Sequence, residues 1–106
     1  MFHFTRDRVR DGDPTKRVYG IARGEVRVGV VRMTGVGRER TDLEVECVPE
    51  LSEGDRDELR FSIRAFVAEL ATGWGWPVAE VTEPASGKWA EEPAGGFRLA
   101  LAFQIA

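Results

Sequence analysis

The stretch that decides the fold is residues 52–72, which read SEGDRDELRFSIRAFVAELAT. Large apolar residues recur in it every three or four positions and so share one face of an α-helix; they are Leu59, Ile63, Phe66, Val67 and Leu70. Ser52 or Asp55 can cap the first turn, and Gly73 and Gly75 are typical of a helix end. The sequence therefore predicts one long helix over residues 52–73.

Residues on either side of this helix predict strands. Short segments of alternating apolar and polar residues lie within residues 2–48, separated by turns rich in Gly and Pro. Residues 97–105 alternate most regularly and predict a final strand with one large apolar face. Residues 74–96 hold three prolines, a glycine pair and all three tryptophans, and predict an irregular loop.

These elements predict a single α+β domain over residues 1–106. We expect a mainly antiparallel sheet of about five strands in ββββαβ order, packed on one face by the helix. One helix covers only one face of such a sheet. Alternation places Val31 and Met33 of the third strand and Ala100 and Ala102 of the last strand on the uncovered face.

Composition limits the classes of protein to consider. The chain has 106 residues, of which 42% are hydrophobic and 31% charged, as in ordinary globular domains. No apolar run approaches the roughly 20 residues that span a bilayer. A single cysteine, Cys47, excludes an intrachain disulfide and a thiolate zinc site. We therefore expect a cytoplasmic protein without membrane, metal or cofactor.

Charge is distributed unevenly along the chain. Residues 1–40 hold ten Lys and Arg against five Asp and Glu, whereas residues 41–106 hold five against thirteen. Pairing of basic with acidic strands across the sheet explains this asymmetry in one way. A basic surface for an anionic partner explains it in another.

The motifs of catalysis are absent from the sequence. His3 is the only histidine, and the serines have no nucleophile-elbow context. Cys47 falls on the inward face of a strand. Residues 86–88 resemble the end of a phosphate-binding loop but lack its first glycine and the Ser or Thr that follows Lys88. We expect a protein that is not an enzyme.

The leading hypothesis is a protein–protein interaction domain, acting as a homodimer or as a small subunit of a larger assembly. Phe61 lies roughly 200° around the helix from Leu59, opposite the core stripe, unless the 74–96 loop covers it. The tryptophans are typical contact residues if exposed, although burial in the core is the alternative. The candidate contact residues are Phe61, Ala65, Ala68, Trp74, Trp76, Trp89, Met33, Ala100 and Ala102.

Two alternatives stay open. Binding of single-stranded nucleic acid would use arginines of the first strands, with Phe2, Phe4 or Tyr19 for stacking; these arginines are Arg6, Arg8, Arg10, Arg17, Arg27, Arg38 and Arg40. Binding of a small ligand would use a pocket between helix and sheet under the tryptophan loop.

Overall fold

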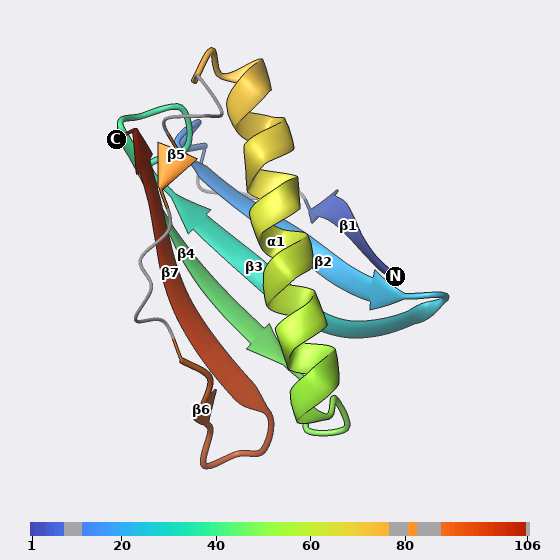
Figure 1. Ribbon diagram of the computed structural model, residues 1–106. Coiled ribbons are helices and arrows are strands. Elements are labelled where there is room, and N and C mark those ends of the chain that lie inside the picture. The colour runs from blue at the N-terminus through green and yellow to red at the C-terminus, as the bar shows by residue number, and fades with distance from the viewer. Residues whose placement is uncertain (8–11, 77–80, 83–87, 106) are drawn as a thin grey trace.

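The computed structural model describes residues 1–7, 12–76, 81–82 and 88–105. Within these residues it contains one helix and one antiparallel sheet (Figure 1). The elements are β1 (Phe2–Asp7), β2 (Lys16–Arg23), β3 (Val26–Thr34), β4 (Arg40–Cys47), α1 (Glu53–Gly73), β5 (Val81–Thr82), β6 (Ala90–Glu91) and β7 (Phe97–Ile105). The predicted α+β class and ββββαβ order are confirmed, with β5 and β6 as two short additional strands within the expected loop.

The sheet is an antiparallel meander extended by the last strand. Its order is β1-β2-β3-β4-β7-β5, and β6 also pairs with β7. β7 pairs with β4 along eight residues, from Arg40 opposite Gln104 to Cys47 opposite Phe97. β5 and β6 pair with the two ends of β7 on its other side. The most apolar strand of the chain therefore has described neighbours on both sides.

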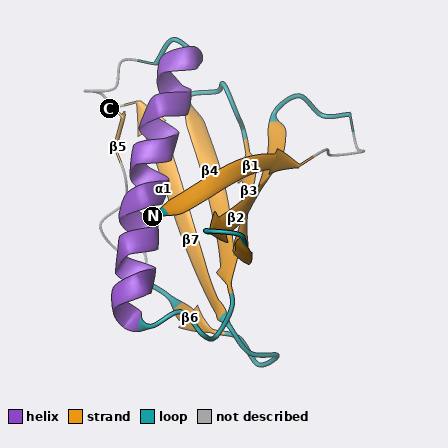
Figure 2. Cartoon of the chain, turned by 90° about the vertical axis from the view of Figure 1, so that its right-hand side faces the viewer, coloured by secondary structure: helices purple, strands orange, loops and turns teal. Residues whose placement is uncertain are grey.

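The core lies between α1 and one face of the sheet, and Figure 2 shows the helix on that face alone. Leu59, Ile63 and Val67 of α1 have no exposed surface. They belong to one cluster with strand residues such as Val45 and Leu99, which are also fully buried. Since burying one such side chain stabilises the fold by about 1.5–3 kcal/mol, this cluster holds helix and sheet together.

An aromatic cluster joins the helix to the first two strands. The ring of Phe66 on α1 stacks on Phe4 of β1, with centroids 4.4 Å apart. Tyr19 of β2 meets the same ring edge-on at 4.9 Å. Aromatic pairs of this geometry contribute about 0.5–1.5 kcal/mol beyond burial. The helix therefore binds the β1–β2 end of the sheet as well as its centre.

The expected orientation of Val31 and Met33 is wrong. Both are buried in the core beneath the helix rather than on the uncovered face. The cause is a β-bulge, because the β2–β3 register shifts between Ile21 and Ala22. Val28 is buried as well, three positions before Val31, so the alternation of β3 breaks between them. Gly29 permits this geometry, since a Cβ there would overlap the carbonyl oxygen of Glu46.

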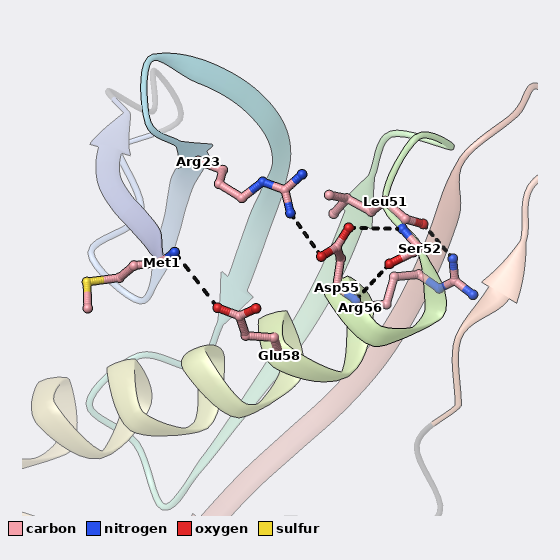
Figure 3. A network of polar contacts seen from close by, with 7 residues as sticks. All are labelled: Met1, Arg23, Leu51, Ser52, Asp55, Arg56 and Glu58. Atoms are coloured by element: carbon pink, nitrogen blue, oxygen red, sulfur yellow. Dashed lines mark hydrogen bonds and ion pairs between the residues drawn. The ribbon is translucent and has the colours of Figure 1, made fainter.

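The start of α1 is fixed by a capping box (Figure 3). Ser52 Oγ accepts a hydrogen bond from the backbone N–H of Asp55 at 3.1 Å, and the Asp55 carboxylate accepts one from the Ser52 N–H at 3.2 Å. Arg23 of β2 lies 3.0 Å from the same carboxylate. These hydrogen bonds to Ser52, with the charge of Arg23, hold the pKa of Asp55 below its ordinary value. Ser52 is thus the predicted cap that the structure uses.

Arg56 ties the first turn of the helix to the last strand. Its guanidinium donates a hydrogen bond to the carbonyl oxygen of Leu51 at 2.7 Å. The same group lies 3.7 Å from the ring centroid of Phe97, within the range of a cation–π contact. The beginning of α1 is therefore held by β2 through Arg23 and by β7 through Arg56.

Replacing Asp55 by Asn should make stability less dependent on pH. A lowered pKa means that the ionised carboxylate stabilises the fold above its ordinary pKa of 3.8, and that this contribution is lost as the pH falls through the folded-state value. The difference in free energy of unfolding between wild type and Asp55→Asn should therefore be largest near pH 7 and shrink below about pH 4. Urea unfolding at several pH values measures it.

Ser52→Ala is the matched variant, because Ser52 is the main cause of the lowered pKa. It should weaken the same pH dependence while leaving the charge in place. A difference for Asp55→Asn that stays constant from pH 7 to pH 3 would contradict a stabilising role for the carboxylate charge.

Candidate functional site

The outer side of α1 carries an exposed aromatic residue. Phe61 is 77% exposed, and it is the one large hydrophobic side chain on the helix that is exposed in the described part of the chain. Ala65 is also exposed, and Ala68 is half-buried. We call these three residues the Phe61 surface. Among the residues that the structure describes, none covers the side chain of Phe61, as its exposed fraction shows.

One of the three tryptophans is buried and the other two are half-buried. Trp76 is 6% exposed, so it is a core residue and not the exposed contact residue considered from the sequence. Trp74 is half-buried and meets Trp76 edge-on, with ring centroids 5.5 Å apart. Trp89 is half-buried and packs against the main core. Large flat side chains placed after the helix thus fill the end of a small core.

The second uncovered surface is the sheet face opposite α1, which we call the outer sheet face. Ala100 of β7 is exposed there and Ala102 is half-buried. Met33 does not belong to it, because the bulge in β3 turns Met33 into the core. The residues at the centre of this face are charged instead.

Four of these charges form crossed pairs over β3, β4 and β7. Arg32 is opposite Glu44 in the β3–β4 register, yet its guanidinium lies 3.3 Å from Glu46. Arg98 is opposite Glu46 in the β4–β7 register, yet it pairs with Glu44 at 2.5 Å. The hydrogen bond to Glu44 raises the pKa of Arg98. Opposite charges alternate across the three strands, so the centre of the outer sheet face is electrically balanced.

This network accounts for part of the uneven charge distribution by pairing across strands. Glu44 and Glu46 of β4 pair with arginines of the two neighbouring strands, Arg32 of β3 and Arg98 of β7. Arg98 follows the helix by 25 positions in sequence. Its place beside β4 depends on the strand order, which no local pattern predicts.

Two hollows flank the charged network. One, of about 400 Å³, lies where β3 and β4 meet the turn between β6 and β7; it is lined by residues that include Val30, Cys47 and Glu92. The other, of about 350 Å³, lies over β3, β4 and β7 and is lined by residues that include Thr34, Asp42 and Ala100. Neither lies between the helix and the sheet, where a small-ligand pocket was considered.

Two of the arginines proposed for nucleic-acid binding are paired with carboxylates of the same chain. Arg27 pairs with Asp7 at 2.8 Å and Arg40 with Asp42 at 3.0 Å. Arg17 is half-buried, whereas Arg6 and Arg38 are exposed. Arg8 and Arg10 lie outside the described residues.

The aromatic residues considered for base stacking point into the protein. Phe2 and Tyr19 are each 5% exposed, and Phe4 is stacked on Phe66. A single-strand platform needs aromatic faces open to the bases. Nucleic-acid binding through the first strands therefore stays a prediction. The aromatic residues considered for stacking on bases are not open to a nucleic acid.

The described residues give little support for covalent catalysis or metal binding. Burial raises the pKa of the Cys47 thiol, which keeps it protonated and weakly nucleophilic. In the ranges that the structure describes, no three His, Cys, Asp or Glu side chains are grouped to hold a metal ion. No helix among those residues has the length and apolarity to cross a bilayer.

Comparison with protein-family models, curated proteins and solved structures found no match to this chain. Its function must therefore be inferred from its own surfaces.

Reversing one charge in the crossed network should destabilise the sheet. Arg32→Glu places a third acid beside Glu44 and Glu46, and Glu46→Arg places a third base beside Arg32 and Arg98. Each change should lower the free energy of unfolding by about 1 kcal/mol, since exposed pairs contribute about 0.2–1 kcal/mol and like charges repel. Urea unfolding measures both variants.

The double variant Arg32→Glu with Glu46→Arg restores a balanced set of charges. It should recover part of the loss. Additive losses in the double variant would show that the two side chains do not interact.

Proposed function

We propose that this chain is a non-catalytic protein–protein interaction domain, acting as a homodimer or as a small subunit of a larger assembly. The observation that carries the proposal is the 77% exposure of Phe61 in the middle of α1. Burying such a side chain at an interface gains about 1.5–3 kcal/mol. Aromatic residues of this kind provide much of the binding energy where they enter a partner surface.

The neighbours of Phe61 favour close contact with a partner. Ala65 follows it by one helical turn and Ala68 by two, so both lie near it on the outer side of α1. Small side chains beside one large aromatic side chain leave shallow depressions, into which side chains of a partner can pack. Neither alanine carries polar groups that must lose water on binding. The Phe61 surface therefore combines one apolar anchor with a low cost of desolvation.

The outer sheet face is the weaker candidate for such an interface. Its centre is occupied by Arg32, Glu44, Glu46 and Arg98, which are already paired with one another. A partner covering them would remove four charges from water, and the attraction between those charges is already gained without the partner. Ala100 and Ala102 add little apolar area in return. These energies support the helix surface as the principal contact.

Phe61→Glu should remove both self-association and capture of other proteins while leaving the fold intact. The substituted side chain is exposed, so the free energy of unfolding, measured with urea, should change by less than about 0.5 kcal/mol. The measurements are mass in solution by light scattering and capture by the immobilised chain from a cell extract.

Val26→Glu is the matched control, because Val26 is 64% exposed but lies at the start of β3 and not on α1. It should retain every association that Phe61→Glu loses. Equal effects of the two variants, or no effect of Phe61→Glu on either measurement, would remove the helix from the proposed interface.

A further inference from the structure

We infer that the partner of the Phe61 surface is a basic amphipathic helix of a different protein, with Lys or Arg on both sides of its apolar stripe. The inference rests on the proposed interaction function and names the chemistry of the partner. It is drawn from which charges of α1 are already engaged within the chain and which are not.

The arginines of α1 are engaged within the chain. Arg56 is held at the start of the helix by a hydrogen bond and a cation–π contact. Arg60 and Arg64, which lie on one flank of Phe61, each have an interaction within their own chain as well. A partner that binds at Phe61 would therefore have to compete for these guanidinium groups.

The acids beside Phe61 are engaged less or not at all. Asp57 lies one turn before Phe61 and Glu69 about two turns after it, on opposite flanks, and both are exposed. Among the residues that the structure describes, no hydrogen bond or ion pair holds either carboxylate. Glu58 lies on the same flank as Glu69, and Figure 3 shows it directed toward the Met1 amino group, 3.8 Å away. Both groups of that pair are exposed, so solvent screens their attraction.

These acids select a basic partner of another kind rather than a second copy. A second copy paired helix to helix would offer Asp57 and Glu69 only arginines that are already engaged in their own chain. Contact between two copies would rest on the Phe61 ring alone and is the weaker association. A different protein with available Lys or Arg gains the burial of that ring and the attraction of the flanking carboxylates together.

Ala65 and Ala68 favour a helix as the shape of that partner. Both lie on the outer side of α1, about one and two turns beyond Phe61. Their small side chains allow the axis of another helix to approach to about 8–10 Å. An apolar stripe on that helix then covers the Phe61 ring, and its basic side chains lie beside the acids on the two flanks.

The area of the contact predicts a weak complex. Stable specific interfaces bury about 1,200–2,000 Å² in total, and the middle turns of one pair of helices provide less. We expect a dissociation constant on the order of micromolar. The affinity should fall as salt is raised, because the flanking charges are exposed.

The test uses a synthetic helical peptide of about 18 residues, long enough to cover the middle turns of α1. It consists of a Leu stripe flanked by Lys, and its counterpart has Glu in place of every Lys. Fluorescence anisotropy of the labelled peptides, titrated with the whole chain at low and at physiological salt, measures binding. The Lys peptide should bind, more weakly at the higher salt, and the Glu peptide should not.

Variants of the whole chain locate the contact. Phe61→Glu should weaken binding of the Lys peptide by more than about tenfold. Asp57→Lys and Glu69→Lys should each weaken it several-fold, because each change replaces an attraction by a repulsion.

Glu25→Lys is the matched control, because it changes the net charge equally at an exposed residue between β2 and β3. It should bind the Lys peptide like wild type. Circular dichroism and urea unfolding establish that every variant is folded.

Three outcomes would overturn the inference: no binding of the Lys peptide, equal binding of the Glu peptide, or equal losses in Glu25→Lys and Asp57→Lys. In each case, a dimer or a captured protein that depends on Phe61 would leave the proposed function standing. Loss of every association that depends on Phe61 would end both.

Discussion

The apolar side of α1 packs on one face of the sheet through Leu59, Ile63 and Val67, none of which has exposed surface. This contact holds the helix to the sheet, and the residues on both sides of it belong to one buried cluster. Ser52 and Asp55 fix where the helix begins, and Arg23 and Arg56 hold that end to β2 and β7. A helix with one apolar stripe covers one sheet face, so its own outer side and the opposite sheet face remain for other roles.

The sequence was sufficient for the parts of the fold that depend on local periodicity. The helix and the final strand were predicted almost to the residue, because each has a single regular apolar pattern. The orientation of Met33 was not predictable by alternation, because the bulge at Ile21 and Ala22 breaks the period within β3. Likewise, the pairing of Arg98 with Glu44 requires β7 to lie beside β4, which is a property of the topology.

The candidate site likewise combines features that follow from local sequence with features that depend on the path of the chain. Phe61 was identifiable from sequence because the angle around a helix follows from the position alone. The burial of Trp76 was not, since it depends on the path of the chain after the helix. The two uncovered surfaces differ in energy, because one presents an aromatic side chain and the other presents charges already paired.

The most direct test of the central claim, that α1 is both the cover of the sheet and the contact surface, is a dilution series of two-dimensional ¹⁵N–¹H NMR spectra. Amide shifts that change with concentration should be confined to the outer side of α1, including Asp57, Phe61, Arg64 and Ala65. Amides of the outer sheet face, such as Arg32 and Ala100, should not move. Changes at Ala100 and Ala102 without changes in α1 would contradict the claim.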